Sequence, residues 1–304
     1  MRARLLLASL LLAASPGVFA APLKVAVSIV PEQWLITQLG GDDVDVMTLV
    51  KPGLEPEEYS PTPKQLGALT ETSIYFAIGV PFESVWLDRM ASQAPQLHIV
   101  DLHEDLPLRS IEAHHHDGDH DHEHDHDHED EHGHEGAADP HVWLDPQLMV
   151  QMAHKAADAL VEQLPERAAD IRAREADVVK TLNDKTREIA SQLKPYEGQS
   201  FMVYHPAWGY YADRFHLNQL PIELNGREPT PRSLSALIEQ AREHNIHVIF
   251  VQEQFSQAAA RRLAQSLDAE VTTIDPLAAD YIENLQRITD TLVAGFEKSQ
   301  RDKS

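Results

Sequence analysis

The 304-residue sequence contains no cysteine. This absence excludes disulfide bonds, thiolate metal ligands and a lipid anchor attached through cysteine. Positive charge is also scarce, because 25 Lys and Arg stand against 49 Asp and Glu and give a formal net charge of −24. A protein this acidic repels nucleic acid and anionic lipid and attracts cations. We therefore exclude nucleic acid as a partner and expect a cation.

Long apolar runs are missing after the first twenty residues, MRARLLLASLLLAASPGVFA. Two arginines precede the short apolar run Leu5 to Leu12, and Val18-Phe19-Ala20 is typical of a signal-peptide cleavage site. The run is too short to span a bilayer, although an uncleaved anchor helix stays an alternative. We predict a signal peptide over 1–20 that is cleaved near Ala20, and a periplasmic mature protein without a membrane span.

Lysine and arginine are absent from residues 112–137, which hold eleven acids and ten histidines. Such a composition cannot bury a core, so we expect a disordered loop over 112–138. Neutral imidazoles bind Zn²⁺ well and carboxylates add oxygen ligands. The loop is either a solvated insert without a role or, as we favour, an auxiliary zinc collector. Its candidate ligands are His114, His115, His116, His120, His122, His124, His126, His128, His132 and His134.

Runs of strand length alternate with helical patterns in two blocks, and the runs are apolar on both faces, as in covered parallel sheets. The predicted strands are 23–30, 44–50, 73–79 and 97–102 in the first block and 200–204, 216–222, 246–252 and 269–275 in the second. Prolines mark the predicted helix starts, because proline suits the first helical position. These starts are Pro31, Pro63, Pro146, Pro206 and Pro231, with Asp145 as the N-cap before Pro146.

A stretch without Gly or Pro, 166–194, carries apolar residues at helical spacing and predicts one helix of roughly 43 Å. A helix of that length can join two lobes. The predicted fold class is α/β, with two lobes that are each a mostly parallel sheet flanked by helices. We place the first lobe at 21–165, the linking helix at 166–195 and the second lobe at 196–304.

Candidate metal ligands fall at or near the carboxyl ends of predicted strands, where open α/β sheets bind ligands. His205 and Asp275 each end a strand just before a proline, and His141 precedes a helix. Glu57 and Glu58 lie in the proline-rich loop KPGLEPEEYSPTP. Two imidazoles and two carboxylates form a reasonable first shell for a divalent cation. Each residue also has an ordinary structural interpretation, and spacing alone does not bring them together.

Four segments, PGxxPxxYxPTP, HVWLDP, HPAWGYYADRF and IDPL, resemble the cluster A-I (cluster 9) metal solute-binding proteins of ABC importers. The similarity covers nearly the whole mature chain. The His- and acid-rich loop before HVWLDP is similar to that of the zinc-uptake (ZnuA-like) branch. The resemblance implies two α/β lobes with a metal site between them and the ligands Glu57, His141, His205 and Asp275.

The position of Glu57 departs from the family pattern, since the resemblance implies a histidine there. A site with two nitrogens and two oxygens favours harder ions such as Mn²⁺ more than a three-histidine site does. The histidine-rich loop argues for zinc instead. Manganese or iron as the bound ion therefore stays an alternative.

The leading interpretation is a monomeric periplasmic solute-binding protein that captures Zn²⁺ in the cleft between the lobes. It would deliver the ion to an inner-membrane ABC permease. We expect no enzyme, because the motifs GxSxG and GxxxxGK are absent from the sequence and HExxH is absent outside the His- and acid-rich run 112–137. Two further interpretations stay open: a metal-dependent periplasmic hydrolase that uses the same histidines, and a metal buffer or adhesin-like surface protein.

Overall fold

The computed structural model describes residues 21–110, 138–223, 227, 229–252, 254–255 and 257–301. The predicted signal peptide and all ten histidines of the predicted loop site lie outside these residues. None of the helices in these ranges is both long and apolar enough to cross a membrane.

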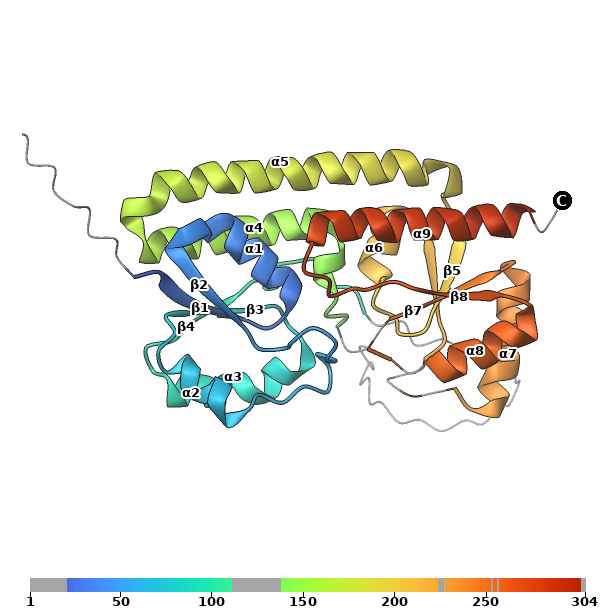
Figure 1. Ribbon diagram of the computed structural model, residues 1–304, viewed down its shortest axis with the longest axis horizontal. Coiled ribbons are helices and arrows are strands. Elements are labelled where there is room, and N and C mark those ends of the chain that lie inside the picture. The colour runs from blue at the N-terminus through green and yellow to red at the C-terminus, as the bar shows by residue number, and fades with distance from the viewer. Residues whose placement is uncertain are drawn as a thin grey trace, which may run out of the picture.

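The first lobe is built on four strands, each followed by a helix or a loop (Figure 1). Its strands are β1 (Leu23–Val27), β2 (Val44–Thr48), β3 (Ile74–Ala77) and β4 (His98–Asp101). Its helices are α1 (Val30–Gly40), α2 (Pro63–Leu69), α3 (Pro81–Gln93) and α4 (Pro146–Gln163). The second lobe follows α5 (Ala168–Leu193), which joins the two lobes.

The second lobe repeats the pattern of the first. Its strands are β5 (Ser200–Val203), β6 (Asn218–Pro221), β7 (Val248–Val251) and β8 (Glu270–Thr273). Its helices are α6 (Gly209–Arg214), α7 (Pro231–Glu243), α8 (Gln257–Leu267) and α9 (Tyr281–Arg301).

Both sheets are parallel throughout the described strands and have corresponding strand orders, β2-β1-β3-β4 and β6-β5-β7-β8. This confirms the predicted fold class of two α/β lobes. The lobes therefore share an architecture, although the sequence shows no repeat. Parallel order places the carboxyl ends of all four strands of a sheet at one edge, and this is where the candidate ligands lie.

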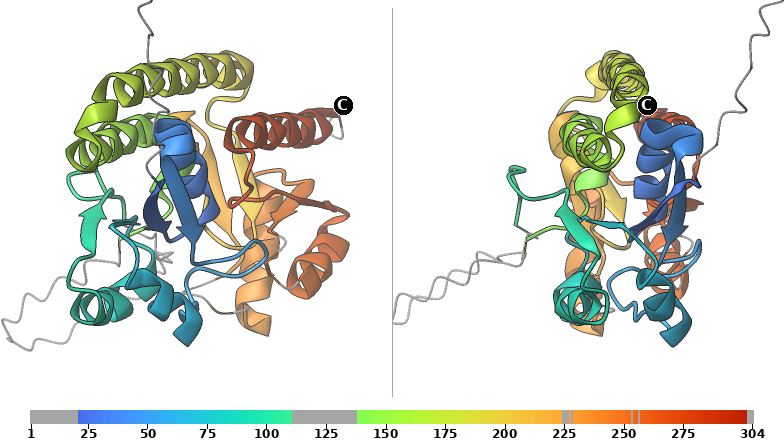
Figure 2. Two further views of the ribbon diagram at one scale, coloured as in Figure 1. Left: turned by 60° about the vertical axis from the view of Figure 1, so that its left-hand side comes forward. Right: turned by 90° about the vertical axis from the view of Figure 1, so that its left-hand side faces the viewer.

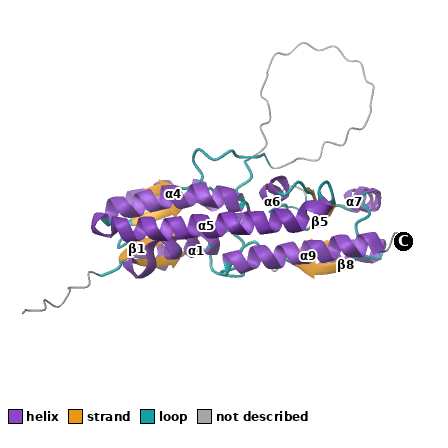
Figure 3. Ribbon diagram, turned by 90° about the horizontal axis from the view of Figure 1, so that it is seen from above, coloured by secondary structure: helices purple, strands orange, loops and turns teal. Residues whose placement is uncertain are grey.

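Helices α4, α5 and α9 run side by side along the molecule (Figure 3). Helix α5 spans both lobes, while α2 and α3 cover the opposite side of the first sheet (Figures 1 and 2). The apolar positions of α5 that recur in the sequence are all buried: Ile171, Val178, Leu182, Ile189 and Leu193. The predicted apolar stripe is therefore the face that packs on the helices below it.

One hydrophobic core runs through both lobes. It begins at β1 and β3, includes the buried faces of α4 and α5, and continues to one face of the second sheet and to α9. A separate, smaller core lies between the other face of the second sheet and helices α7 and α8. The lobes are thus joined by shared packing as well as by the chain.

Three local features differ from the sequence-based expectations. The linking helix is shorter than predicted, because 3₁₀ turns at Pro165–Arg167 and Lys194–Tyr196 bound the α-helix. Helix α6 begins at Gly209 and not at Pro206, since Trp208 occupies the N-cap position. Helix α3 was not predicted, and its hydrophobic periodicity is weak.

Candidate metal centre

Two histidines and one glutamate converge between the lobes. Nε2 of His141 lies 3.3 Å from Nε2 of His205, and Oε1 of Glu57 lies 3.3 Å from His205 Nε2 and 3.9 Å from His141 Nε2. Both imidazoles are buried and Glu57 is partly exposed. This is the one group of His and acidic residues with metal-binding spacing in the part of the chain that the structure describes.

The spacing of the three atoms suits a tetrahedral ion. Ligands at ~2.0–2.1 Å from zinc are ~3.3–3.4 Å apart when the geometry is tetrahedral. Two of the three separations agree with this value, and the third is about half an ångström longer. Octahedral ligands at ~2.1 Å would lie ~3.0 Å apart, which is shorter than all three separations.

The loop that carries Glu57 is fixed to the end of β2. The hydroxyl of Tyr59 donates to the backbone carbonyl of Leu49 at 2.7 Å, and the side-chain amide of Gln65 donates to the same carbonyl. Thr62 then caps α2 by accepting from the backbone N–H of Gln65, and Pro63 takes the first helical position. The repeated prolines and Tyr59 of this motif therefore serve to hold Glu57 in place.

His141 is oriented by a buried carboxylate. Oδ1 of Asp139 lies 2.7 Å from Nδ1 of His141 and also accepts the backbone N–H of His141 at 3.0 Å. A carboxylate on Nδ1 makes Nε2 the free lone pair, as in the carboxylate–histidine pairs that support zinc sites. The ring also lies beside Trp143, at 5.1 Å between centroids. Asp139 thus aims His141 at the other two ligands.

His205 has a corresponding carboxylate in the second lobe. It lies two residues after β5, and its Nδ1 is 3.3 Å from Oε1 of Glu223, which follows β6 and is buried. The side chain of Gln252, after β7, bonds both the backbone N–H and the carbonyl of His205. The ring stacks on Phe255 at 4.7 Å. Three neighbouring strands therefore fix this imidazole.

The protonation of the site is set by its own carboxylates. Burial alone would lower the pKa of His205, but Glu223 and Glu57 outweigh burial and raise that pKa from 6.5 to about 10. Burial alone would raise the pKa of Glu57, yet the imidazoles of His205 and His141 bring that pKa below its usual value. Without metal, His205 is therefore an imidazolium paired with Glu57 and Glu223. A divalent cation that binds here must displace the proton of His205.

Asp275 lies outside the group of three. It follows β8, and its Oδ1 accepts from the backbone N–H of Leu277 at 2.9 Å and from Nε2 of Gln254 at 3.2 Å. The carbonyl of the next residue, Pro276, accepts from the indole N–H of Trp143. In this structure the IDPL segment is a turn that packs against the first lobe.

Three carboxylates near the site were not anticipated from the sequence. Asp139 and Glu223 bond to the two histidines. Glu55 lies close enough to both imidazoles for their charges to change its pKa. Burial raises the pKa of Glu55, while the charges of His205 and His141 act against that rise. The only available signal was position: Asp139 stands two residues before His141, and Glu223 stands two residues after a strand.

Two lobes of corresponding topology, with metal-ligand side chains between them, are typical of a solute-binding receptor for a metal ion. A profile of the family described as zinc-uptake complex component A, periplasmic, matches residues 25–295. The chain belongs to this family, whose members are binding receptors and not a class of enzymes. The family assignment confirms the resemblance drawn from the four sequence motifs.

Individual relatives agree with the family assignment. A crystal structure of ZnuA superposes with a TM-score of 0.81 at 32% identity, covering 90% of this chain and 99% of the other. The high-affinity zinc uptake system protein ZnuA of Yersinia pestis is 25% identical over 293 residues, which are 91% of this chain and 90% of that one. The zinc-binding protein AdcA of Streptococcus pyogenes serotype M3 is 26% identical over 259 residues, 84% of this chain. This chain spans 50% of the length of AdcA.

Proposed function

We propose that this protein captures Zn²⁺ at Glu57, His141 and His205 and delivers it to an ABC permease of the inner membrane. The observation that carries the proposal is the convergence of three ligand atoms from both lobes at separations that fit a tetrahedral ion. The buried carboxylates behind both histidines support it, because such carboxylates make imidazole a better ligand. The names of the relatives in the same family also indicate zinc uptake.

The fourth ligand is a carboxylate in our proposal. The family resemblance points to Asp275, which would have to give up its bond from Gln254 and turn toward the histidines. Glu55 already lies close enough for the charges of both imidazoles to act on it. Asp275→Asn and Glu55→Gln form a matched pair of neutral substitutions, and the one that weakens zinc binding more identifies the fourth ligand.

The same proposal includes export of the protein to the periplasm, where it would meet the permease. Residues 1–20 direct export and are removed near Ala20, which leaves a monomeric receptor in the periplasm. The histidines of 112–138 act as an auxiliary zinc site. We expect no ester or phosphate hydrolysis by the zinc-loaded protein, because the proposed fourth protein ligand would occupy the position that a catalytic water needs.

Calorimetry on metal-stripped protein beginning at Ala21 tests the proposal, with Zn²⁺ and Mn²⁺ titrated separately. We expect one tight zinc site that His141→Ala and His205→Ala each remove, and weaker binding of Mn²⁺. Manganese binding as tight as zinc would show that Glu57 has changed the preferred ion. Tight zinc binding that survives both alanine substitutions would refute the site.

A further inference from the structure

Four residues form a short neck that brackets residues 111–137: Arg109 and Ser110 on one side, Ala138 and Asp139 on the other. Ser110 and Ala138 make an antiparallel bridge, and the backbone N–H of Asp139 donates to the carbonyl of Arg109 at 2.8 Å. The hydroxyl of Tyr210 in α6 accepts from the N–H of Arg109 and donates to the carbonyl of Asp139. A side chain of the second lobe thus ties both sides of the neck together.

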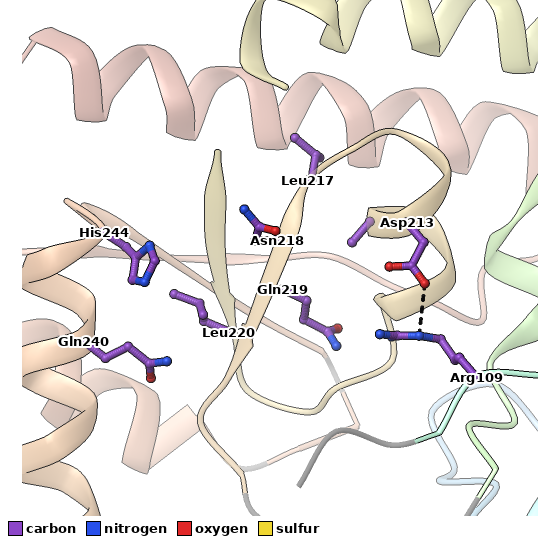
Figure 4. Close-up of a pocket in the computed structure, with 9 residues that line it drawn as sticks. Arg109, Asp213, Leu217, Asn218, Gln219, Leu220, Gln240 and His244 are labelled. Atoms are coloured by element: carbon purple, nitrogen blue, oxygen red, sulfur yellow. Dashed lines mark ion pairs between the residues drawn. The ribbon is translucent and has the colours of Figure 1, made fainter. Parts of the chain in front are cut away.

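The guanidinium of Arg109 crosses from the neck to α6. Its Nε lies 3.2 Å from Oδ2 of Asp213, an ion pair drawn in Figure 4, and its Nη1 lies 3.5 Å from Oδ2 of Asp139. Its charge also lies over the ring of Tyr210, 5.9 Å from the centroid. Arg109 therefore contacts carboxylates of both lobes at once.

Gly209 makes room for this guanidinium. A Cβ atom built on Gly209 would lie 1.2 Å from Nη1 of Arg109, a separation that no side chain can tolerate. The residue before it, Trp208, is the N-cap of α6 and is fully buried, so the end of the arginine side chain is the part that would have to move. The HPAWGY motif therefore needs a glycine at this position, because any side chain would occupy the space that the guanidinium of Arg109 fills.

The contacts of Arg109 lead directly to a metal ligand. Asp139 uses Oδ1 to hold the ring and the backbone of His141, and it turns Oδ2 toward Arg109. Asp139 is 2% exposed. A carboxylate this deeply buried needs an opposite charge, because an unpaired charge in the interior is strongly unfavourable. Removing Arg109 would leave Oδ2 without that charge and would release Asp139 from its position.

We propose that Arg109, seated on Gly209, is a positioning residue for the divalent cation. It fixes Asp139, and through Asp139 it sets the direction in which His141 presents Nε2. This inference rests on the proposed zinc site. It adds that the geometry of that site depends on an interlobe contact at the base of the histidine-rich segment. A disturbance of the neck therefore changes the metal site without touching a ligand.

The test compares zinc affinity and ligand geometry in variants of the mature chain. Zinc dissociation constants are measured against a competing chelator, and Co²⁺ is added below one equivalent so that its visible absorption reports the coordination of the tight site. Arg109→Gln is expected to weaken zinc binding measurably, by at most the ~10–100-fold that loss of a residue bonded directly to a ligand costs, and to change the Co²⁺ spectrum. Arg109→Lys keeps the charge and should recover part of both.

Gly209→Ala should reproduce the effect of Arg109→Gln while leaving the arginine in the chain. The double variant should be no worse than either single one, because both remove the same contact. Arg214→Gln is the matched control: Arg214 also joins α6 to the first lobe, but its partner Asp145 contacts no ligand. This control should lower stability and leave the zinc affinity and the Co²⁺ spectrum unchanged.

Unchanged zinc affinity and an unchanged Co²⁺ spectrum in both Arg109→Gln and Gly209→Ala would overturn the inference. An equal loss in Arg214→Gln would also overturn it, since that result would indicate general loosening of the lobes. If Arg109→Gln does not fold, Arg109→Lys and Gly209→Ala decide by the same two measurements. Failure of the proposed function has a different signature, namely wild-type protein whose zinc binding is absent or indifferent to His141→Ala.

Discussion

At the scale of single residues, the metal site consists of the ligand side chains and of the carboxylates that orient the two histidines. His141 and His205 each present Nε2 to the ion position because a carboxylate occupies Nδ1. Glu57 adds the negative charge that a third histidine would not have. The choice of ion therefore depends on few side chains, and substitutions at these positions should change selectivity separately from stability.

Glu57→His should shift selectivity toward zinc. The substitution replaces an oxygen ligand by a nitrogen, which favours Zn²⁺ over Mn²⁺. We expect the ratio of the two affinities to rise by about tenfold, the equivalent of ~1.4 kcal/mol. Paired calorimetric titrations measure it. Glu58→His is the control, because Glu58 is the exposed neighbour on the same loop, and an equal shift in that variant would contradict a role for Glu57.

Zinc binding should release about one proton at neutral pH. The pKa of His205 is about 10 in the metal-free site, so this imidazole is protonated at pH 7 and must lose its proton to bind the ion. The apparent affinity should then fall ~tenfold for each pH unit lowered between pH 9 and pH 7. Calorimetry in buffers of different ionisation enthalpy counts the protons, and a binding heat independent of buffer would disprove the assignment.

At the scale of elements, the ends of strands and helices carry most of the polar chemistry. Asp145 caps α4 by accepting the N–H of Gln147, and it also receives both Nε and Nη2 of Arg214. Glu32 and Glu83 occupy the third position of α1 and α3 and accept the backbone N–H groups where β1 and β3 end. Asp145 therefore connects a helix start to a distant part of the fold, whereas Glu32 and Glu83 join their helices to the strands just before them.

Asp145→Ala should destabilise the protein by ~1–3 kcal/mol, because it removes a helix cap and leaves Arg214 without its carboxylate. Asp145→Asn keeps an oxygen for the cap and loses the charge, so it should cost less. Urea unfolding of the metal-free protein measures both. Equal losses in the two variants would show that the cap contributes little.

Glu32→Gln should remove a pH-dependent loss of stability. Burial and the neighbouring Glu83 raise the pKa of Glu32 well above 4.5, and burial raises the pKa of Glu83 as well. A carboxyl whose pKa is raised on folding stabilises the protein below its unfolded pKa and loses that contribution as pH rises. The stability of the variant relative to the wild type should therefore rise as the pH increases above the usual glutamate value of 4.5, as measured by urea unfolding.

The control for this trend is Glu58→Gln, since Glu58 is exposed. Its stability relative to the wild type should not change over the same pH range. A stability difference between Glu32→Gln and the wild type that stays constant with pH would contradict the raised pKa of Glu32.

Sequence patterns predicted the elements better than they predicted the site. All eight strands were expected from their apolar runs, because strands covered on both faces have a distinct composition. Asp275 stays a predicted ligand, and in this structure its carboxylate accepts a hydrogen bond within its own turn. The roles of Glu223 and Arg109 depend on contacts between segments that are distant along the chain, and Asp139 was marked only by its position two residues before His141.

At the scale of the whole molecule, the two lobes share a core, and α5 spans both of them (Figure 1). Large rotations between lobes would break this packing. We therefore expect small movements on metal binding, confined to the loops at the strand ends.

Replacing 111–137 by Asn-Gly should preserve the tight zinc site. Ser110 and Ala138 are already antiparallel bridge partners, and a two-residue Asn-Gly turn can join such partners. Calorimetry should then show one tight site and none of the weaker binding that we expect of the full chain. Loss of the tight phase, with the fold kept by circular dichroism, would mean that the segment supplies a ligand to it.

The packing of α9 on the first lobe has a consequence for the order of folding. Tyr281, the first residue of α9, packs against Trp34 with ring centroids 4.8 Å apart and donates its hydroxyl to the carbonyl of Trp143. The chain leaves a ribosome or a translocation pore with its N-terminus first. The packing of the first lobe therefore cannot be completed until α9 has emerged. The earliest part made is thus among the last parts completed, and nascent chains that stop before Tyr281 should remain targets for chaperones and proteases.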